Sequence, residues 1–149
     1  MRLQRFATEV LVIGAGPAGL AAGYTAARSG RHVILVDENP MPGGQIWRGE
    51  WMTPHSSEAA LWFDKVRRAR LTLLTGIRVI AEVAERTLLG EDQQAAYEFR
   101  YKTLILATGA RERFLPFPGW TLPNVMGAGG LQALVKMGFP IRGKRVVVA

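Results

Sequence analysis

The stretch Glu9–Glu38, EVLVIGAGPAGLAAGYTAARSGRHVILVDE, decides the fold of this 149-residue chain. Val10–Ile13 is a short apolar run rich in β-branched residues, which is typical of a buried parallel strand. Pro17 stands where a first helical turn begins, a position that tolerates proline because its missing N–H would be unpaired anyway. Small residues follow, and a second apolar run, His32–Val36, ends at Asp37. The stretch therefore predicts a β-α-β unit.

The first turn of this unit carries Gly-x-Gly-x-x-Gly at Gly14, Gly16 and Gly19, with Asp37 about 20 residues further on. Gly14 makes the tight turn, Gly16 lets a pyrophosphate approach the backbone, and Gly19 and Gly23 let the helix lie close to the sheet. The helix N-terminus offers N–H groups and a partial positive charge to that pyrophosphate. Asp37 is placed to accept from a ribose 2′-hydroxyl and would repel a 2′-phosphate, which argues against NADP. These features leave FAD and NAD open, because both present the same ADP half.

Two other interpretations of this stretch are disfavoured. Arg2 and Arg5 followed by VLVIGAGPAGLAAG superficially resemble a secretory signal peptide. The Gly/Pro interruption, Glu9 and the downstream strand with its acid all argue against a signal peptide. A glycine-rich turn without a ligand would lose backbone entropy for no gain.

The overall composition excludes several kinds of site. The chain contains no cysteine, so it has no disulfide framework, thiolate nucleophile or cysteine metal site, which fits a cytoplasmic protein. His32 and His55 are too few and too far apart to predict a metal site. No apolar run approaches the ~18–20 residues that span a bilayer, so we expect no membrane span. The net charge is +7, but the basic residues are spread along the chain rather than concentrated beside aromatics, so we expect no nucleic-acid binding.

The rest of the chain predicts further elements in order. Leu104–Ala107 is expected to form a buried strand followed by Thr108 and Gly109, which places Gly109 beside the glycine turn, because ligands bind outside the carboxyl ends of parallel strands. Val146–Ala149 follows basic residues in the manner of a new parallel strand. The other expected elements are a helix at Ser56–Ala69 with Ser57 as its N-cap, a third parallel strand at Leu71–Leu74, a small antiparallel meander of Arg78–Ala84, Thr87–Leu89 and Ala96–Tyr101, and a helix at Leu131–Met137.

These elements predict an α/β fold. We expect a Rossmann-like parallel sheet with helices and a small antiparallel β-meander, ending at the first strand of a second nucleotide-binding unit. The expected domains are residues 1–110 as an FAD-binding domain with its meander at about 78–101, residues 111–142 as a crossover, and residues 143–149 as the first strand of a truncated NAD-type domain.

Three separated motifs identify a family resemblance. GAGPAGLAAG, DENPMPGGQIWRG and TLILATGARERFLPFPGW resemble the pyridine nucleotide–disulfide oxidoreductase superfamily of two-domain flavoproteins. GGQIWR and ARERFLPFPGWTLPNVMGAGGLQALVK are similar to one branch, the FAD-binding subunits of opine dehydrogenases, hydrogen cyanide synthase and the alpha subunit of sarcosine oxidase. The resemblance covers nearly the whole chain in order, and the GGQ and ATG stretches favour FAD over NAD.

The resemblance implies a set of cofactor-binding residues. Asp37 stands where the family's ribose-binding acid stands, and Glu38 could share that role. Val79 lies near where the family meets the adenine with backbone atoms. The full implied FAD set is Gly14, Ala15, Gly16, Pro17, Ala18, Gly19, Asp37, Glu38, Gly43, Gly44, Gln45, Val79, Ala107, Thr108 and Gly109.

The resemblance also implies an activity. The complete enzyme would oxidise a C–N bond of an amine or amino acid through FAD, with NAD in the missing second domain and with a second flavoprotein subunit for its partner. No CxxxxC follows the GG turn, which excludes glutathione-reductase-like disulfide chemistry. No side chain is identified as a general base. Two alternatives stay open: a truncated or vestigial nucleotide-binding module without turnover, and a plain NAD-binding Rossmann protein. The sequence names neither the substrate nor the electron acceptor, nor the natural chain length.

Overall fold

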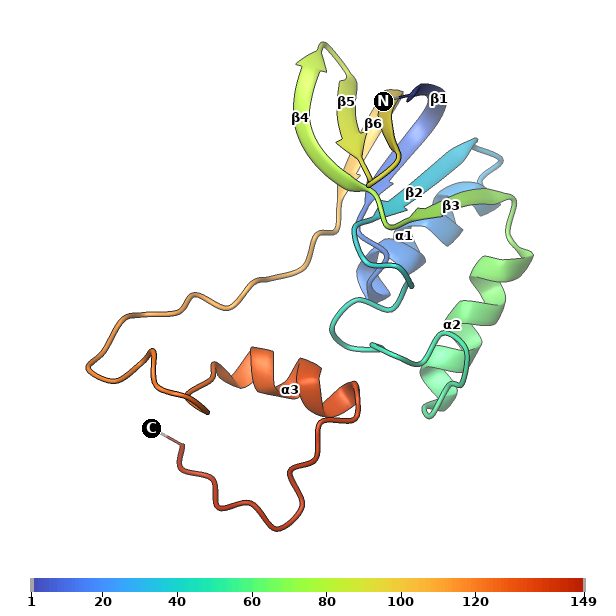
Figure 1. The fold of residues 1–149 in the computed structure, drawn as a ribbon. Coiled ribbons are helices and arrows are strands. Elements are labelled where there is room, and N and C mark those ends of the chain that lie inside the picture. Colours follow the sequence, from blue (N-terminus) through green and yellow to red (C-terminus); the bar gives the residue numbers. More distant parts are fainter. Residues whose placement is uncertain (1, 149) are drawn as a thin grey trace. The chain divides into compact units, whose positions relative to one another are not determined.

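The computed structural model describes residues 2–148. It consists of two compact units, residues 1–109 and residues 110–149, which are described separately. The division lies next to the boundary expected at residue 110, and the roles assigned to the segments stay predictions. The helices and strands are labelled in Figure 1.

The first unit is built on one six-stranded sheet of order β3-β2-β1-β6-β5-β4. The first four strands in this order pair in parallel, and β6, β5 and β4 pair antiparallel. This confirms the expected α/β class with its antiparallel meander. The strands are β1 (Arg2–Ile13), β2 (Val33–Asp37), β3 (Leu71–Thr75), β4 (Arg78–Ala84), β5 (Thr87–Glu91) and β6 (Ala95–Leu106).

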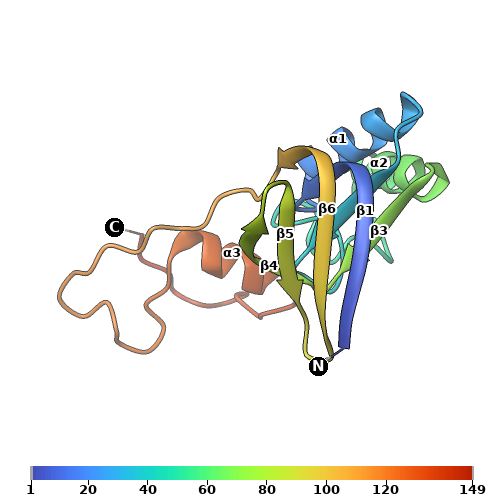
Figure 2. The ribbon, with the colours of Figure 1, turned by 90° about the horizontal axis from the view of Figure 1, so that it is seen from above.

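Strands β1 and β6 are much longer than their apolar runs predict. Each has 12 residues, and they pair in parallel from Arg2↔Ala95 to Ile13↔Leu106. Strand β6 is therefore both the last strand of the meander and a strand of the parallel layer, as Figure 2 shows. The sequence pattern missed the first half of β1 because its polar residues do not form an apolar run, and its partner lies far along the chain.

The sheet buries side chains on both faces, as the alternation of a strand requires. Val10, Val12 and Leu35 lie in a core cluster with α1 and α2 residues, so both helices cover this face (Figure 1). Leu11 and Ile34 point to the opposite face. There they join a second cluster with residues of the meander, namely Leu88, Tyr97 and Phe99.

Both helices of the first unit begin at recognisable signals, and α1 also ends at one. Helix α1 (Pro17–Arg28) begins with proline at its first position, and Gly30 follows it with φ +81°. Helix α2 (Ser57–Arg68) is capped by Ser56, whose hydroxyl accepts from the N–H of Ala59 at 3.0 Å. The N-cap is therefore Ser56 rather than the expected Ser57.

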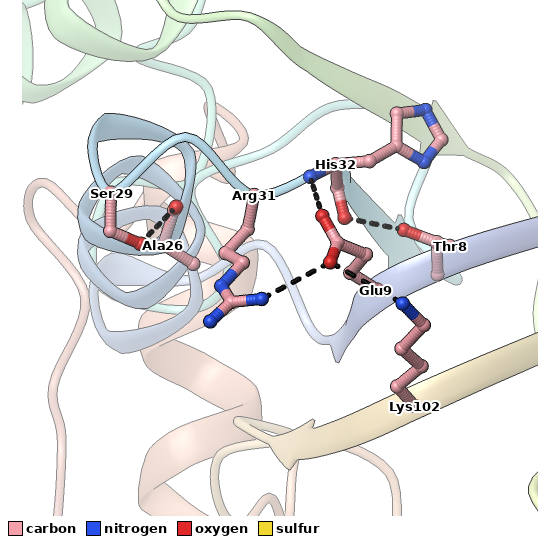
Figure 3. Close-up of polar contacts among 7 residues, drawn as sticks. All are labelled: Thr8, Glu9, Ala26, Ser29, Arg31, His32 and Lys102. Atoms are coloured by element: carbon pink, nitrogen blue, oxygen red, sulfur yellow. Dashed lines mark hydrogen bonds and ion pairs between the residues drawn. The ribbon is translucent and has the colours of Figure 1, made fainter.

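Glu9 of β1 joins this strand to the residues just before β2 and to β6 (Figure 3). Its carboxylate accepts from the N–H of His32 at 3.0 Å and pairs with Arg31 at 3.2 Å and Lys102 at 3.5 Å. The backbone hydrogen bond from His32, and next the side chain of Arg31, lower the pKa of Glu9. Thr8 adds a hydrogen bond from its hydroxyl to the carbonyl of His32 at 2.7 Å. These contacts fix β1 between the start of β2 and β6.

The second unit contains one described helix, α3 (Ala128–Lys136). The carboxylate of Glu112 accepts from the N–H groups of Gly129 and Gly130, both at 3.2 Å, and so satisfies donors in the first turn of α3.

Residues 144–148 have no regular secondary structure, and Val147 is 92% exposed. A strand needs a neighbour for its backbone groups, so the strand expected at residues 143–149 stays a prediction; Ala149 lies outside the described residues. None of the helices in residues 2–148 has the length and apolarity to cross a bilayer.

Candidate functional site

The glycine turn between β1 and α1 has no room for side chains at two of its positions. Gly14 has φ +103°, and its N–H donates to the carbonyl of Val36 at 2.7 Å. A Cβ on Gly14 would overlap the carbonyl oxygen of Ala107, and one on Gly19 would overlap that of Gly14. Glycine at both positions is therefore required by the close approach of three backbone segments.

The N-terminus of α1 is not capped by a protein side chain. Its N-cap residue is Gly16, and its first turn contains no acidic residue. The N–H groups of Gly16, Ala18 and Gly19 donate to no protein acceptor in the part of the chain that the structure describes. Pro17 has no N–H to offer. Such a helix end is an anion site, with free donors and a partial positive charge.

The second motif packs directly on the first. The N–H of Gly43 donates to the carbonyl of Ala15 at 2.7 Å, and a Cβ on Gly44 would lie 2.9 Å from the Cα of Gly16. Gly43 and Gly44 adopt φ of +119° and +58°. The two glycine loops thus contact each other backbone to backbone, and Gln45, an exposed residue, follows at their edge.

The third motif reaches the same turn from β6. The N–H of Ala107 donates to the carbonyl of Ile13 at 2.8 Å, and the backbone of Ala107 and Thr108 lies against Gly14. Gly109 follows with φ +70°. The structure therefore brings all three predicted motifs together at the carboxyl ends of the parallel strands.

Asp37 is buried beneath the glycine turn and fully engaged with the protein. One carboxylate oxygen, Oδ2, accepts from the N–H of Ala15 at 2.5 Å. The other, Oδ1, accepts from both the N–H and the side-chain amide of Asn39, each at 2.7 Å. The residue is only 6% exposed. Asp37 thus braces the turn, and a ribose hydroxyl would have to share an oxygen that already holds these donors.

The neighbouring acid differs sharply from Asp37. Glu38 is exposed at the end of β2. The carboxylate of Glu91, hydrogen-bonded to Arg78, raises the pKa of Arg78, and Glu38 adds a weaker effect of the same sign. The negative charge of Glu38 therefore lies near the start of β4.

Val79 and Asn39 lie at the expected adenosine end. Val79 is half-buried on β4, opposite Gly90, two residues after Ile77, whose N–H donates to the carbonyl of Asp37 at 3.0 Å. Asn39 was not predicted from the sequence, yet it supplies two of the three donors to Asp37. A signal was present, because Asx side chains readily hydrogen-bond the backbone two residues away.

A family model for the pyridine nucleotide-disulphide oxidoreductases matches residues 8–148. The chain belongs to this family. That match confirms the resemblance drawn from the three motifs and places the chain in a family of oxidoreductases.

Individual relatives support the branch within the family. One subunit of the opine oxidase of Rhizobium meliloti is 39% identical over 140 residues, which cover 86% of this chain and 30% of that protein. The HcnB subunit of hydrogen cyanide synthase from Pseudomonas aeruginosa is 35% identical over 139 residues, which cover 86% of this chain and 30% of that protein. Among solved structures, L-proline dehydrogenase from P. horikoshii superposes with a TM-score of 0.65 at 16% identity, over 93% of this chain and 34% of that one, and shares the fold. The chain thus spans about a third of the length of these curated relatives.

FAD is the cofactor of this family, and the site fits it. The uncapped start of α1 suits a pyrophosphate, and a Cβ on Gly16 would meet nothing nearer than the Cα of Gly44 at 3.8 Å, so the approach is open. Which residues hold FAD stays a prediction. Within residues 2–148 no group of three or more His, Asp or Glu side chains could hold a metal ion.

Proposed function

We propose that this chain is the FAD-binding part of a flavin-dependent dehydrogenase that acts on an amine or amino acid of the opine type. The observation that supports it most is the convergence of three glycine-containing loops around one uncapped helix N-terminus. Within the Gly14–Gly19 turn, the N–H groups of Gly16, Ala18 and Gly19 would bind the pyrophosphate. Gly43–Gln45 and Ala107–Gly109 would line the cofactor on either side.

The substrate class comes from the relatives. An opine oxidase and a hydrogen cyanide synthase each contain a protein that shares more than a third of its aligned residues with this chain, over 86% of the chain's length. FAD supplies a two-electron acceptor for oxidation of a C–N bond. The protein's own contribution is to bind and orient the cofactor through backbone amides.

The adenosine end would be recognised by two acids with different tasks. Asp37 holds the turn in place through Ala15, and its shared oxygen and the exposed Glu38 are the acceptors for ribose hydroxyls. Two carboxylates at this end oppose a 2′-phosphate, which disfavours NADP.

Purified protein tests the cofactor assignment. We expect a yellow preparation, and we expect added FAD to raise the melting temperature, because a ligand that binds only the folded state stabilises it by mass action. NAD added alone should raise it less. A colourless protein whose melting temperature responds to neither FAD nor NAD would favour the truncated or vestigial module without turnover. A response to NAD alone would favour a plain NAD-binding Rossmann protein.

The substrate assignment needs the full-length polypeptide together with the second flavoprotein subunit. Addition of an opine, a secondary amino acid such as proline, and an unrelated alcohol under anaerobic conditions should bleach the flavin absorption only with the C–N substrates. Bleaching by the alcohol alone would reject the amine class while leaving the FAD assignment intact.

A further inference from the structure

A groove lies between the carboxyl-terminal ends of α1 and α2, on the first unit, with a volume of about 450 Å³. Four cationic side chains line it: Arg28, Lys65, Arg68 and Arg70. The single carboxylate in its wall, Asp64, pairs with Arg68 at 2.9 Å. Within residues 2–148, Arg28, Lys65 and Arg70 form no ion pair. The groove is therefore a concentrated positive site.

Aromatic rings hold two of the four cations, Arg28 and Lys65, in place. Tyr24 of α1 and Trp62 of α2 pack edge to face with their centroids 6.0 Å apart. The ammonium of Lys65 lies 4.3 Å from the centroid of Trp62, and the guanidinium of Arg28 lies 5.9 Å from that of Tyr24. Cation–π contacts of this kind restrain long side chains that would otherwise be mobile. Part of the ordering needed to bind an anion is thus already present in the protein.

The helix dipoles explain why some of these basic residues stand at helix ends, but not why they meet around one groove. Basic residues in a last helical turn are favoured by the partial negative charge of the helix end, which suits Arg28, Lys65 and Arg68. Arg70 lies beyond the end of α2, outside its last helical turn. The meeting of cations from two helices around one concavity is a separate feature.

We propose that this groove docks an acidic segment of a partner polypeptide. Carboxylate side chains match its charge, and its volume accommodates a few of them. Lys65 already lies over the ring of Trp62, and Lys65 and Arg28 lie over that of Tyr24. The rings are therefore less available to stacked bases than the bare aromatic platforms of a single-stranded nucleic-acid channel. The groove lies toward the far end of α1 from the glycine turn. Its lining residues on α1, Tyr24 to Arg28, are about 12–18 Å from Gly16 at 1.5 Å per residue, so docking leaves the cofactor site open.

Fluorescence anisotropy with a short fluorescein-labelled peptide of alternating Asp and Glu residues tests the proposal on the purified chain. We expect saturable binding that weakens as salt is added, since exposed charges are screened. The double variant Lys65→Glu/Arg70→Glu should weaken binding by about tenfold or more. The matched control Arg86→Glu/Arg100→Glu changes the net charge equally at exposed meander positions and should stay within about twofold of the wild type.

Several results would overturn the proposal. These are no binding by the wild-type chain, an equal loss in both double variants, or tighter groove-dependent binding of single-stranded DNA than of the peptide. The milder pair Lys65→Gln/Arg70→Gln, with a smaller loss, guards against misfolding of the charge reversals. The FAD-induced rise in melting temperature is measured on each variant and should be unchanged. A wild-type chain that binds the peptide but not FAD would retain the groove and reject the proposed function.

Discussion

The backbone N–H of Ala15 donates to the buried carboxylate of Asp37 at 2.5 Å, joining the glycine turn to the end of β2. Asp37, which the sequence predicts to bind a ribose, therefore also stabilises the glycine turn that would bind the pyrophosphate. Cofactor affinity and stability of the empty protein should depend on the same side chain.

Asp37→Asn should lower both stability and FAD affinity. Aspartate accepts on both oxygens, from Ala15 on one and from two Asn39 donors on the other, whereas an amide has one accepting oxygen. Depending on its orientation, the variant therefore loses either the Ala15 donor or both Asn39 donors. A buried donor left unsatisfied costs about 1–3 kcal/mol. Urea unfolding without FAD measures this loss. The control Glu38→Gln, at the neighbouring exposed position, should lower the unfolding midpoint less. Identical midpoints for Asp37→Asn and wild type would show that the brace is unimportant.

Two alanine substitutions in α1 should have opposite effects. At Gly23 a Cβ would meet Leu71 and Leu35 at 3.8 and 3.9 Å, which are ordinary contacts, so Gly23→Ala should stabilise the protein by about 0.5–1 kcal/mol through helix propensity. At Gly19 the Cβ would overlap the carbonyl oxygen of Gly14, so Gly19→Ala should destabilise it and abolish FAD binding. Thermal melts of the two variants check this. Equal shifts would mean that the helix does not lie as close to the turn as the structure has it.

Gly44→Ala should weaken FAD binding more than its backbone strain explains. Both Gly44 and Gly30 have positive φ, +58° and +81°, so alanine is strained at each. A Cβ at Gly44 would in addition lie 2.9 Å from the Cα of Gly16, whereas one at Gly30 would meet nothing within 4 Å. Titration with FAD should show a larger increase in Kd for Gly44→Ala than for Gly30→Ala. Matching increases would argue that the two glycine loops do not need to touch.

Glu9→Gln should make stability less dependent on acid pH. The hydrogen bonds from the His32 backbone and the Arg31 side chain lower the pKa of Glu9 below 4.5 in the folded protein. Ionised Glu9 therefore adds stability above that pH, and this stability is lost as the pH falls through the lowered value. The variant should be less stable than wild type at neutral pH, and the two should converge in acid. Unfolding midpoints across this range measure it, with Glu82→Gln, an exposed acid of β4, as the charge control. A constant gap at all pH values would contradict the linkage.

The sequence predicted the local parts of this fold well. The turn glycines, Pro17 at the start of α1 and Gly30 at its end act through backbone geometry within a few residues, and the sequence displays that directly. The full length of β1 was not predictable, because Arg2–Thr8 is held by residues more than 90 positions away.

The candidate site divides in the same way. The motifs were found from their spacing, but the docking of Gly43 on Ala15 and the double role of Asp37 are contacts between loops, which no periodicity encodes. Choosing FAD over NAD likewise needed a family resemblance, because the ADP half is common to both.

The continuous pairing of β1 with β6 limits how the protein can change in length. Inserting one residue into β6 after Tyr101 would move every later side chain to the opposite face, exchanging Leu104 and Ile105 between the two cores and shifting Ala107 off Gly14. Only a matching insertion in β1 would restore the alignment. The paired lengths of these two strands therefore fix the distance between the far end of the meander and the glycine turn.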